Sequence, residues 1–336
     1  MNIVHVVNGF DISGRSRIIH DLCLRLRGDE FRFYIASLSG GCRYNQCDVE
    51  CRNLHRKETG FDWRVVGRLK HMAKRRGARI VHSHGRGALP YASLAVRGMK
   101  GVRLIHSVHR SDGDLVSSHG WVRRFFLGAV DRAVAVSNAA RDAFCEVNGF
   151  DKDRCDVIHN GVDATRFVAE AEPVNVRRGP RVSHIPPRIL SAGGPLIGTI
   201  ANLSYDKDID TVLQAFKALH AQHQGARLVI AGDGPRADEA RRMASHMGLK
   251  QTVAFLGFRT DIPHILSALD VFVFSTHTEG FGLAVLEAMA AGLPVIVSRV
   301  GGLCEIVKHE RNGLLVESGS PDALCAALSL LADDEA

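Results

Sequence analysis

Two glutamates, Glu279 and Glu287, lie on either side of a glycine turn and are well placed to bind a ligand. The turn is Gly-Phe-Gly at 280–282, between an apolar run at 269–275 that predicts a buried strand and an apolar helix leading to a second strand at 293–298. This order places backbone N–H groups at the carboxyl edge of a sheet, where phosphate is favoured. Glu287 would lie about two turns inside the helix. Because carboxylates repel phosphate, we expect them to accept hydrogen bonds from sugar hydroxyls, which indicates a nucleotide-sugar site.

The string from Thr278 to Gly292 resembles the donor-site motif of the retaining glycosyltransferases of the GT-B fold, family 4 (group 1). The resemblance implies that Glu279 contacts the transferred sugar and that Glu287 binds the ribose hydroxyls. It also implies donor contacts by the residues of the turn, which are Gly280, Phe281, Gly282 and Leu283. The plainer alternative is an ordinary α/β crossover with surface glutamates. It would account for one glutamate beside one glycine turn, but not for two in register with the whole motif.

The segment 197–210 resembles the strand and loop with which this family contacts the donor diphosphate through an arginine and a lysine. Lys207 stands at the lysine position, just before a helix expected from Asp210 to Leu219, and its charge would stabilise the leaving group. The arginine position holds Asn202, which can donate hydrogen bonds but brings no charge. Leaving-group stabilisation would then depend on Lys207 and on the helix N-terminus near Gly282. The alternative for Lys207 is a solvated loop lysine.

Two further loops of the C-terminal half resemble family segments that line the donor cleft. Gly232 and Gly234 form a Gly-x-Gly after a predicted strand, which is weak evidence for phosphate binding by itself. Phe258 and Arg259 resemble the strand end and turn that meet the nucleobase, largely through backbone groups. These side chains therefore do not distinguish uridine from guanosine.

Two positions of the N-terminal half also match family landmarks. The run 104–109 ends a predicted buried strand, and the family has a histidine near the transferred sugar here, which makes His109 a catalytic candidate; a structural histidine is the alternative. After the first strand the family usually has a Gly-Gly pair followed by Glu, whereas this chain keeps only Gly14, a donor-binding candidate. Arg15 and Arg17 add positive charge there, which either favours an anionic acceptor or marks weakened catalysis.

The composition is that of a soluble globular protein, with 336 residues of which 46% are hydrophobic and 24% charged. No apolar run reaches the ~20 residues needed to span a bilayer. The N-terminus lacks the basic region and cleavage site of a signal peptide, so we expect a cytoplasmic protein. Among eight cysteines, Cys42, Cys47 and Cys51 lie near His55, but their spacing lacks the C-x-x-C form of strong zinc sites. We therefore predict reduced thiols and no metal site.

Charge is distributed unevenly. Residues 1–170 carry a net charge of +10 and residues 171–336 a net charge of −3, which points to an anionic partner for the first half. No nucleic-acid-binding motif accompanies this charge, so no nucleic-acid partner is expected. The segment 62–76 predicts a basic amphipathic helix, with Trp63, Val66 and Leu69 on or near its apolar face. Two interpretations stay open: a helix that rests on an anionic membrane surface, and a sheet-covering helix with a solvated outer face.

Short apolar runs alternate with helical patterns in two series, which predicts an α/β protein with parallel sheets. The expected strands are Ile3–Val7, Phe33–Leu38, Ile80–His82, Leu104–Val108, Arg132–Val136, Arg154–Ile158, Leu196–Ile200, Ala226–Ile230, Thr252–Leu256, Val271–Ser275, Val295–Ser298 and Gly313–Val316. We predict an acceptor-side domain (1–168), a proline-rich connection (169–194) and a donor domain (195–336), two Rossmann-like domains that face each other across a cleft, as in GT-B. The family usually continues past the position of Ala336 with helices that cross back onto the first domain, so we expect this closing segment to be missing and domain closure to be in doubt.

These features predict a retaining glycosyltransferase that moves a sugar from a UDP-sugar or GDP-mannose to a glycan, lipid-linked or small-molecule acceptor, in cell-envelope or exopolysaccharide synthesis. The resemblance implies front-face attack, in which the departing diphosphate helps to take the acceptor's proton. No protein nucleophile, metal or cofactor is then required. Two alternatives stay open. One is a nucleotide-sugar epimerase of the same architecture, against which Glu279, Glu287 and Lys207 argue. The other is a degenerate glycosyltransferase that acts as a partner protein.

Overall fold

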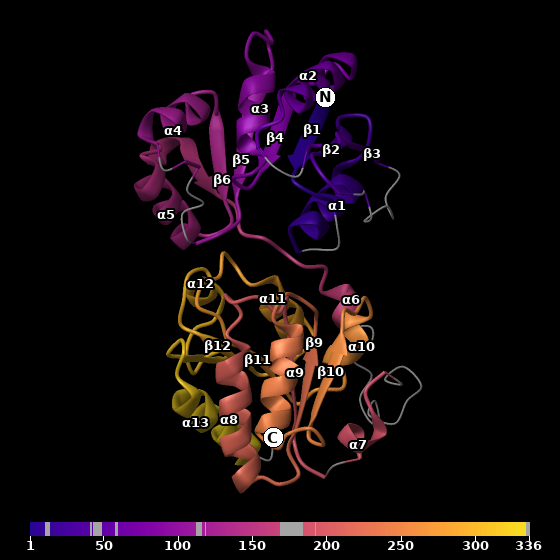
Figure 1. Cartoon of the computed structure of the whole chain (residues 1–336), viewed down its shortest axis with the longest axis vertical. Coiled ribbons are helices and arrows are strands. Elements are labelled where there is room, and N and C mark those ends of the chain that lie inside the picture. The colour runs from indigo at the N-terminus through magenta and orange to yellow at the C-terminus, as the bar shows by residue number, and fades with distance from the viewer. Residues whose placement is uncertain are drawn as a thin grey trace. The chain divides into compact units, whose positions relative to one another are not determined.

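The computed structural model describes residues 1–10, 14–40, 42, 49–57, 60–111, 116–117, 119–168, 184–191 and 193–333. The chain divides into two compact units, Met1–Asn160 and Gly161–Ala336, each built around one parallel sheet (Figure 1). This confirms the predicted pair of Rossmann-like domains. Within the described ranges, no helix combines the length and the apolar character that a membrane crossing requires.

The first unit contains a seven-stranded sheet in the order β3-β2-β1-β4-β5-β6-β7, with every neighbouring pair parallel. Its strands are β1 (Asn2–Val7), β2 (Arg32–Ser37), β3 (Glu50–Asn53), β4 (Ile80–His84), β5 (Arg103–Val108), β6 (Arg132–Ala135) and β7 (Cys155–Val157). Its helices are α1 (Gly14–Leu26), α2 (Trp63–Arg75), α3 (Leu89–Val96), α4 (Gly120–Leu127) and α5 (Asn138–Asn148), with a 3₁₀ turn at Lys152–Arg154. The strand order reverses between β1 and β4, which we call the first switch point.

The second unit contains a six-stranded parallel sheet in the order β10-β9-β8-β11-β12-β13. Its strands are β8 (Leu196–Ile200), β9 (Arg227–Ala231), β10 (Val253–Gly257), β11 (Val271–Phe274), β12 (Val295–Ser298) and β13 (Leu314–Val316). Its helices are α6 (Thr165–Val168), α7 (Pro187–Leu190), α8 (Ile209–Gln222), α9 (Ala237–His246), α10 (Ile262–Leu266), α11 (Leu283–Ala290), α12 (Leu303–Ile306) and α13 (Pro321–Asp333). The order reverses between β8 and β11, the second switch point.

Successive strand residues of the second unit pack into two separate cores, one on each face of the sheet. Ile197, Val271 and Val273 belong to a core completed by α8, α9 and α13. Phe272 and Phe274 belong to the other core, which α10, α11 and α12 complete. Because both faces are covered, the strands are continuous apolar runs rather than alternating ones. That property made the strands of this unit recognisable in the sequence.

Two parts of the predicted organisation differ from the structure. The boundary lies at Asn160, earlier than residue 168, because Phe167 of α6 packs into the second unit's core. Ile185 and Ile189, inside the predicted connection, are buried in the same core, and Pro187 opens α7, where proline is well tolerated. The remainder of the connection, 169–183 and 192, lies outside the described residues.

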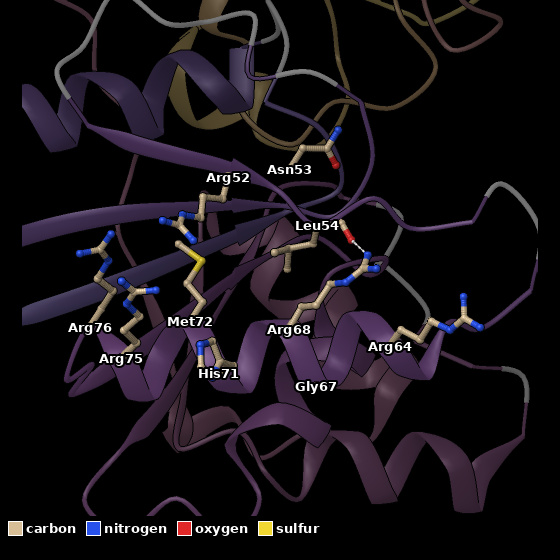
Figure 2. Close-up of a pocket in the computed structure, with 10 residues that line it drawn as sticks. All are labelled: Arg52, Asn53, Leu54, Arg64, Gly67, Arg68, His71, Met72, Arg75 and Arg76. Atoms are coloured by element: carbon tan, nitrogen blue, oxygen red, sulfur yellow. Dashed lines mark hydrogen bonds between the residues drawn. The ribbon is translucent and has the colours of Figure 1, made fainter.

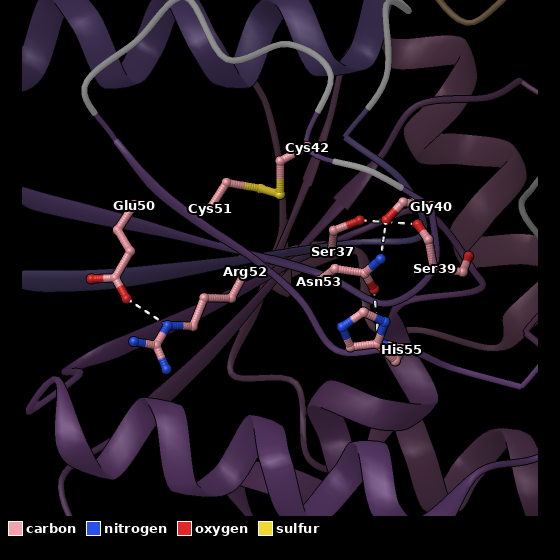
Figure 3. The surroundings of a disulfide bond; sticks show 9 residues. All are labelled: Ser37, Ser39, Gly40, Cys42, Glu50, Cys51, Arg52, Asn53 and His55. Atoms are coloured by element: carbon pink, nitrogen blue, oxygen red, sulfur yellow. Dashed lines mark hydrogen bonds and ion pairs between the residues drawn. A yellow bond between two sulfur atoms is a disulfide. The ribbon is translucent and has the colours of Figure 1, made fainter.

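The strand β3 was missed because its residues, Glu-Cys-Arg-Asn, are polar, as is common for an edge strand. The prediction of reduced thiols is also wrong for one pair: Cys42 and Cys51 form a disulfide with their Cα atoms 6.0 Å apart (Figure 3). That separation lies within the range that a disulfide can bridge. The bond joins the segment after β2 to β3 and removes both sulfurs from the cysteine–histidine metal site considered above. Cys47 lies outside the described residues.

Gly232, directly after β9, fits only without a side chain. Its φ of +131° is unfavourable for other residues, and an added Cβ would lie 1.8 Å from the carbonyl oxygen of Ala201. Gly248 also has a positive φ, +78°, but its Cβ would meet nothing within 4 Å. A side chain would be strained by the backbone conformation at both glycines, but it would overlap a neighbour only at Gly232. Comparing substitutions at the two positions therefore distinguishes steric overlap from backbone strain.

We expect Gly232→Ala to destabilise the protein by about 3 kcal/mol, because the Ala201 backbone must move. Gly248→Ala should cost about 1 kcal/mol, the backbone strain alone. Thermal unfolding of both variants and the wild-type chain measures the difference. Equal losses of stability would show that the close approach of Gly232 and Ala201 is unimportant.

Candidate functional site

The second switch point carries an ion pair between two residues that the sequence had singled out. Lys207 follows β8 and immediately precedes Asp208 at the start of α8, whereas Glu279 follows β11, the neighbouring strand. The Lys207 ammonium group contacts the Glu279 carboxylate directly, and the two side chains are 18% and 17% exposed. The fold thus brings together charges that lie 72 residues apart in the sequence.

Neighbouring groups hold both partners of this pair. The Lys207 Nζ atom lies 4.8 Å from the centroid of the Phe274 ring, at cation–π distance. The backbone N–H of Phe281 donates to Glu279 Oε1 at 3.4 Å, and the N–H of Gly302 donates to the Glu279 carbonyl oxygen at 3.2 Å. The carboxylate is therefore positioned from the side of the glycine turn as well as by the lysine.

The glycine turn itself permits close backbone packing. Gly282 has a φ of +91°, and a Cβ there would lie 2.4 Å from Leu303. A Cβ on Gly302 would lie 2.1 Å from the carbonyl oxygen of Gly280. The helix α11 begins directly after this turn, at Leu283, so its N-terminus lies close in sequence to Glu279. Helix N-termini attract anions such as phosphate.

Glu287 occupies a buried position on α11, with 6% of its surface exposed. It is the fifth helical residue, so it lies just over one turn inside the helix, not two turns as predicted. The difference arises because Gly282 has a left-handed conformation and delays the start of the helix.

A polar network that sequence reasoning missed ties the Lys207 loop to the end of β11. The buried Asp208 carboxylate accepts a hydrogen bond from Ser275 Oγ at 3.1 Å, and His277 Nε2 lies 3.7 Å from its other oxygen. The carbonyl oxygen of Asp206 accepts from Thr276 Oγ1 at 2.7 Å and from the His277 N–H at 2.8 Å. The available signal was the pair of aspartates that flank Lys207.

The loops after β8, β9 and β10 contact one another through backbone groups. The Leu203 N–H donates to the Asp233 carbonyl at 2.9 Å, and the Gly232 N–H donates to the Gly257 carbonyl at 2.8 Å. A Cβ on Gly234 would lie 2.5 Å from Asn202 Oδ1, so the amide of Asn202 lies against this glycine. Asn202, Gly232 and Gly234 therefore lie together at the carboxyl ends of β8 and β9.

Phe258 and Arg259 follow β10 and differ in their contacts with the rest of the protein. Phe258 is 50% exposed. The Arg259 guanidinium donates two hydrogen bonds to the Asp261 carboxylate, both 2.7 Å long, and this partner raises the pKa of Arg259. Because its charge is satisfied within the loop, Arg259 would meet a ligand through its backbone rather than as a free cation.

The remaining predicted site residues belong to the first unit. Gly14 is the exposed first residue of α1. His109 follows β5 directly, and its Nε2 atom lies 3.2 Å from His84 Nδ1. Burial, followed by the nearby Arg15 charge, lowers the pKa of His109 to about 3. Its imidazole is therefore uncharged at neutral pH.

Two family profiles together match most of the chain. The profile of glycosyltransferase family 4 matches residues 12–166, and that of the group 1 glycosyl transferases matches residues 185–336. The two matched regions correspond to the two units of the fold. This chain belongs to the group 1, family 4 glycosyltransferases of the GT-B fold.

Individual relatives agree with this assignment. The glycosyltransferase MJ1607 of Methanocaldococcus jannaschii is 33% identical over 208 residues, which are 60% of this chain and 51% of that protein. The N-acetyl-alpha-D-glucosaminyl L-malate synthase of Bacillus anthracis is 25% identical, over 82% of this chain and 71% of its own. An Escherichia coli UDP-Gal:alpha-D-GlcNAc-diphosphoundecaprenol alpha-1,3-galactosyltransferase is 28% identical, over 85% of this chain and 73% of that protein. The chain thus spans about half the length of the first of these relatives.

Solved structures show the same fold. The Anabaena protein HepE in complex with UDP-glucose superimposes with a TM-score of 0.83 at 21% sequence identity, covering 99% of this chain and 90% of that one. A glycosyltransferase from Rickettsia africae gives a TM-score of 0.81 at 18% identity, with 98% and 87% covered.

If Lys207 faces the leaving group of a sugar transfer, as the family resemblance implies, Lys207→Ala should lower turnover by on the order of 10²–10³-fold, because one stabilising charge is lost. Glu287→Ala should chiefly weaken nucleotide binding, because ribose contacts are similar before and during the reaction. Steady-state kinetics and nucleotide titration separate these effects, and Lys217→Ala, an exposed lysine on α8, is the control. Equal losses of turnover with unchanged nucleotide affinity would contradict both assignments.

Proposed function

We propose that this chain is a retaining glycosyltransferase that transfers a sugar from a UDP-sugar or GDP-mannose to a glycan, lipid-linked or small-molecule acceptor, in cell-envelope or exopolysaccharide synthesis. The observation that carries the proposal is the Lys207–Glu279 ion pair at the second switch point, beside the glycine turn that precedes α11. Ligands of open α/β sheets bind at such reversals of strand order. A lysine for diphosphate and a carboxylate for hydroxyls are the two groups that a nucleotide sugar needs.

The transfer would proceed on one face of the sugar. An acceptor hydroxyl oxygen forms a bond to the anomeric carbon as the bond from that carbon to the diphosphate oxygen breaks. Because the acceptor bonds on the face from which the diphosphate leaves, the anomeric configuration is retained. The departing diphosphate takes the hydroxyl proton. Lys207 would stabilise the negative charge that develops on the diphosphate, Glu279 would hold the sugar hydroxyls, and Glu287 the ribose. His109, uncharged, would border the reacting face as a hydrogen-bonding group.

Two features support an anionic acceptor. Arg15, in the first turn of α1, lies close to Gly85 at the carboxyl end of β4: a Cβ on Gly85 would be 3.1 Å from Arg15 Nη1. Among the relatives, the B. anthracis enzyme is named for malate and the E. coli enzyme for a diphosphoundecaprenol substrate, and both compounds are anions. We propose that Arg15 faces the acceptor's negative group.

A nucleotide-sugar panel tests the main proposal. The purified chain, incubated with UDP-glucose, UDP-galactose, UDP-N-acetylglucosamine and GDP-mannose in turn, should bind one of them and hydrolyse it slowly, and NMR should show an α-linked donor giving an α-sugar first. We expect Mg²⁺ or Mn²⁺ to leave the rate unchanged, because Lys207 and the α11 N-terminus neutralise the diphosphate. An epimerised nucleotide sugar would support the alternative isomerase. Failure to bind any of the four would support the partner-protein alternative.

We also propose that the first unit brings the protein to anionic membrane surfaces. A surface pocket of about 490 Å³ between α2 and β3 is lined by five arginines, Arg52, Arg64, Arg68, Arg75 and Arg76 (Figure 2). Among the described residues, Glu50 contacts Arg52 and Arg76 and so neutralises part of this charge. The others give the helix a basic outer face that suits phosphate headgroups.

Exposed tryptophans accompany this charge. Trp63, predicted on the apolar face of α2, is instead 68% exposed, while Val65, Leu69 and Met72 are buried. Trp121 on α4 is 71% exposed, and α3 packs against both α2 and α4. Exposed tryptophans on a basic surface are typical of proteins that contact the interface of a bilayer. The alternative is that α2 only covers the sheet and that its outer face is solvated.

Liposome co-sedimentation tests the membrane proposal. Binding should require anionic lipid and fall as salt rises. The variant Arg64→Gln, Lys74→Gln, Arg75→Gln removes three exposed charges worth about 1 kcal/mol each, so affinity should drop by on the order of 10²-fold. The matched control, Lys217→Gln, Arg242→Gln, Lys250→Gln, changes the same number of exposed charges in the second unit. Equal weakening by both variants, or no binding to anionic vesicles at low salt, would overturn the proposal.

A further inference from the structure

A cluster of histidines lies at the first switch point, on the two strands where the order reverses. His5 is in β1, and His82 and His84 are in β4. His5 pairs directly with His82 in the strand register, and His84 is two residues further along β4. Because successive side chains of a strand alternate between faces, all three imidazoles lie on the same face of the sheet.

The three rings are close enough to share one ligand. One ring nitrogen from each histidine lies within 4.8 Å of the other two. His5 Nδ1 and His84 Nε2 are 2.9 Å apart. A tetrahedral zinc ion with Zn–N bonds of about 2.0–2.1 Å separates its nitrogen ligands by roughly 3.3 Å, which falls between these two values. Small ring rotations would therefore suffice.

The outer nitrogens of two of the histidines, His82 and His84, resemble those of a supported metal site. His82 Nε2 is bonded to Ser107 Oγ at 2.8 Å, and His84 Nδ1 lies 3.2 Å from His109 Nε2. Metal-binding histidines characteristically use one nitrogen for the ion and the other for such a partner. The third histidine differs: His5 is only 3% exposed, and its Nε2 atom has no hydrogen-bond partner among the described residues.

The chemistry of the cluster suits a cation that prefers nitrogen. Imidazole is a common ligand of zinc and of the later first-row transition metals, and it binds in the uncharged form. His5 and His84 are nearly fully buried, and burial favours the uncharged form. No carboxylate is within the group of ligand atoms found in the described part of the chain, so hard cations such as Mg²⁺ are a poor match.

We propose that His5, His82 and His84 bind one divalent transition-metal ion, Zn²⁺ in the first instance, in the first unit of this protein. Three protein ligands leave a fourth position for water. The ion would link the middle of β1 to the carboxyl end of β4 and, through His84, orient His109. The sequence prediction of no metal site considered only cysteine spacing and overlooked the His-x-His at 82–84. The site is independent of the donor site proposed above, which belongs to the second unit.

Metal analysis of the whole chain, purified without a histidine tag, tests this inference. After removal of metal with a chelator, titration with Zn²⁺ against a chromophoric chelator should give one tight site per chain, and Co²⁺ should produce the visible absorption bands of a tetrahedral nitrogen-ligated ion. His82→Gln and His84→Gln should each weaken binding by more than about 100-fold. Ser107→Ala, which removes only the partner of His82, should weaken it by about 10–100-fold.

The control is His106→Gln, which changes an equally buried histidine on the next strand whose side chain bonds Ser83 Oγ, on the opposite face of β4. It should leave zinc binding intact, and circular dichroism establishes that each variant is folded. Zinc binding that is unaltered by His82→Gln and His84→Gln would mean adventitious binding elsewhere. Absence of a tight site in the folded wild-type chain would mean that the imidazoles form only a hydrogen-bonded stack. Either result overturns the proposal, and neither bears on donor binding.

Discussion

Both candidate sites depend on one topological constraint, the reversal of strand order in the middle of each parallel sheet. At β1 and β4, and again at β8 and β11, neighbouring strands connect to elements on opposite sides, so their carboxyl ends point into a space that no crossover covers. The second reversal holds Lys207 and Glu279, and the first holds His5 and His84. Residues that are far apart in the sequence meet at these positions because the sheet, rather than a local turn, sets their spacing.

The energetic consequence differs between the two positions. At the second, opposite charges with less than a fifth of each side chain exposed compensate each other. Removal of one partner would leave a poorly solvated charge, which is costlier than the loss of a surface ion pair. At the first, burial keeps the imidazoles uncharged, and the positive charge of Arg15 acts in the same direction on His84 and His109. The second sheet therefore presents a preformed ion pair, and the first sheet presents a set of uncharged imidazole nitrogens.

The sequence predicted the strands of each sheet better than the contacts that side chains make within each unit. Buried parallel strands are apolar throughout, so β8 and β12 were identified without error, whereas the polar edge strand β3 gave no such signal. Lys207 and Glu279 were assigned through a recognisable motif, but their direct contact follows from strand order. The His5–His82 pair depends on the register of β1 with β4, and the Cys42–Cys51 disulfide depends on how the chain returns to β3. Neither is encoded in local spacing.

The Lys207–Glu279 ion pair has a further consequence for the order of events in a catalytic cycle of the proposed kind. Lys207 and Glu279 are each other's partners in this structure, so a donor that binds both has to exchange one set of partners for another. An intact nucleotide sugar can supply both, a diphosphate for the lysine and hydroxyls for the carboxylate. The nucleoside diphosphate that remains after transfer supplies only the first and leaves Glu279 unsatisfied. Re-formation of the internal ion pair would then compete with the spent nucleotide for Lys207 and favour its departure, so the ion pair would work against product inhibition.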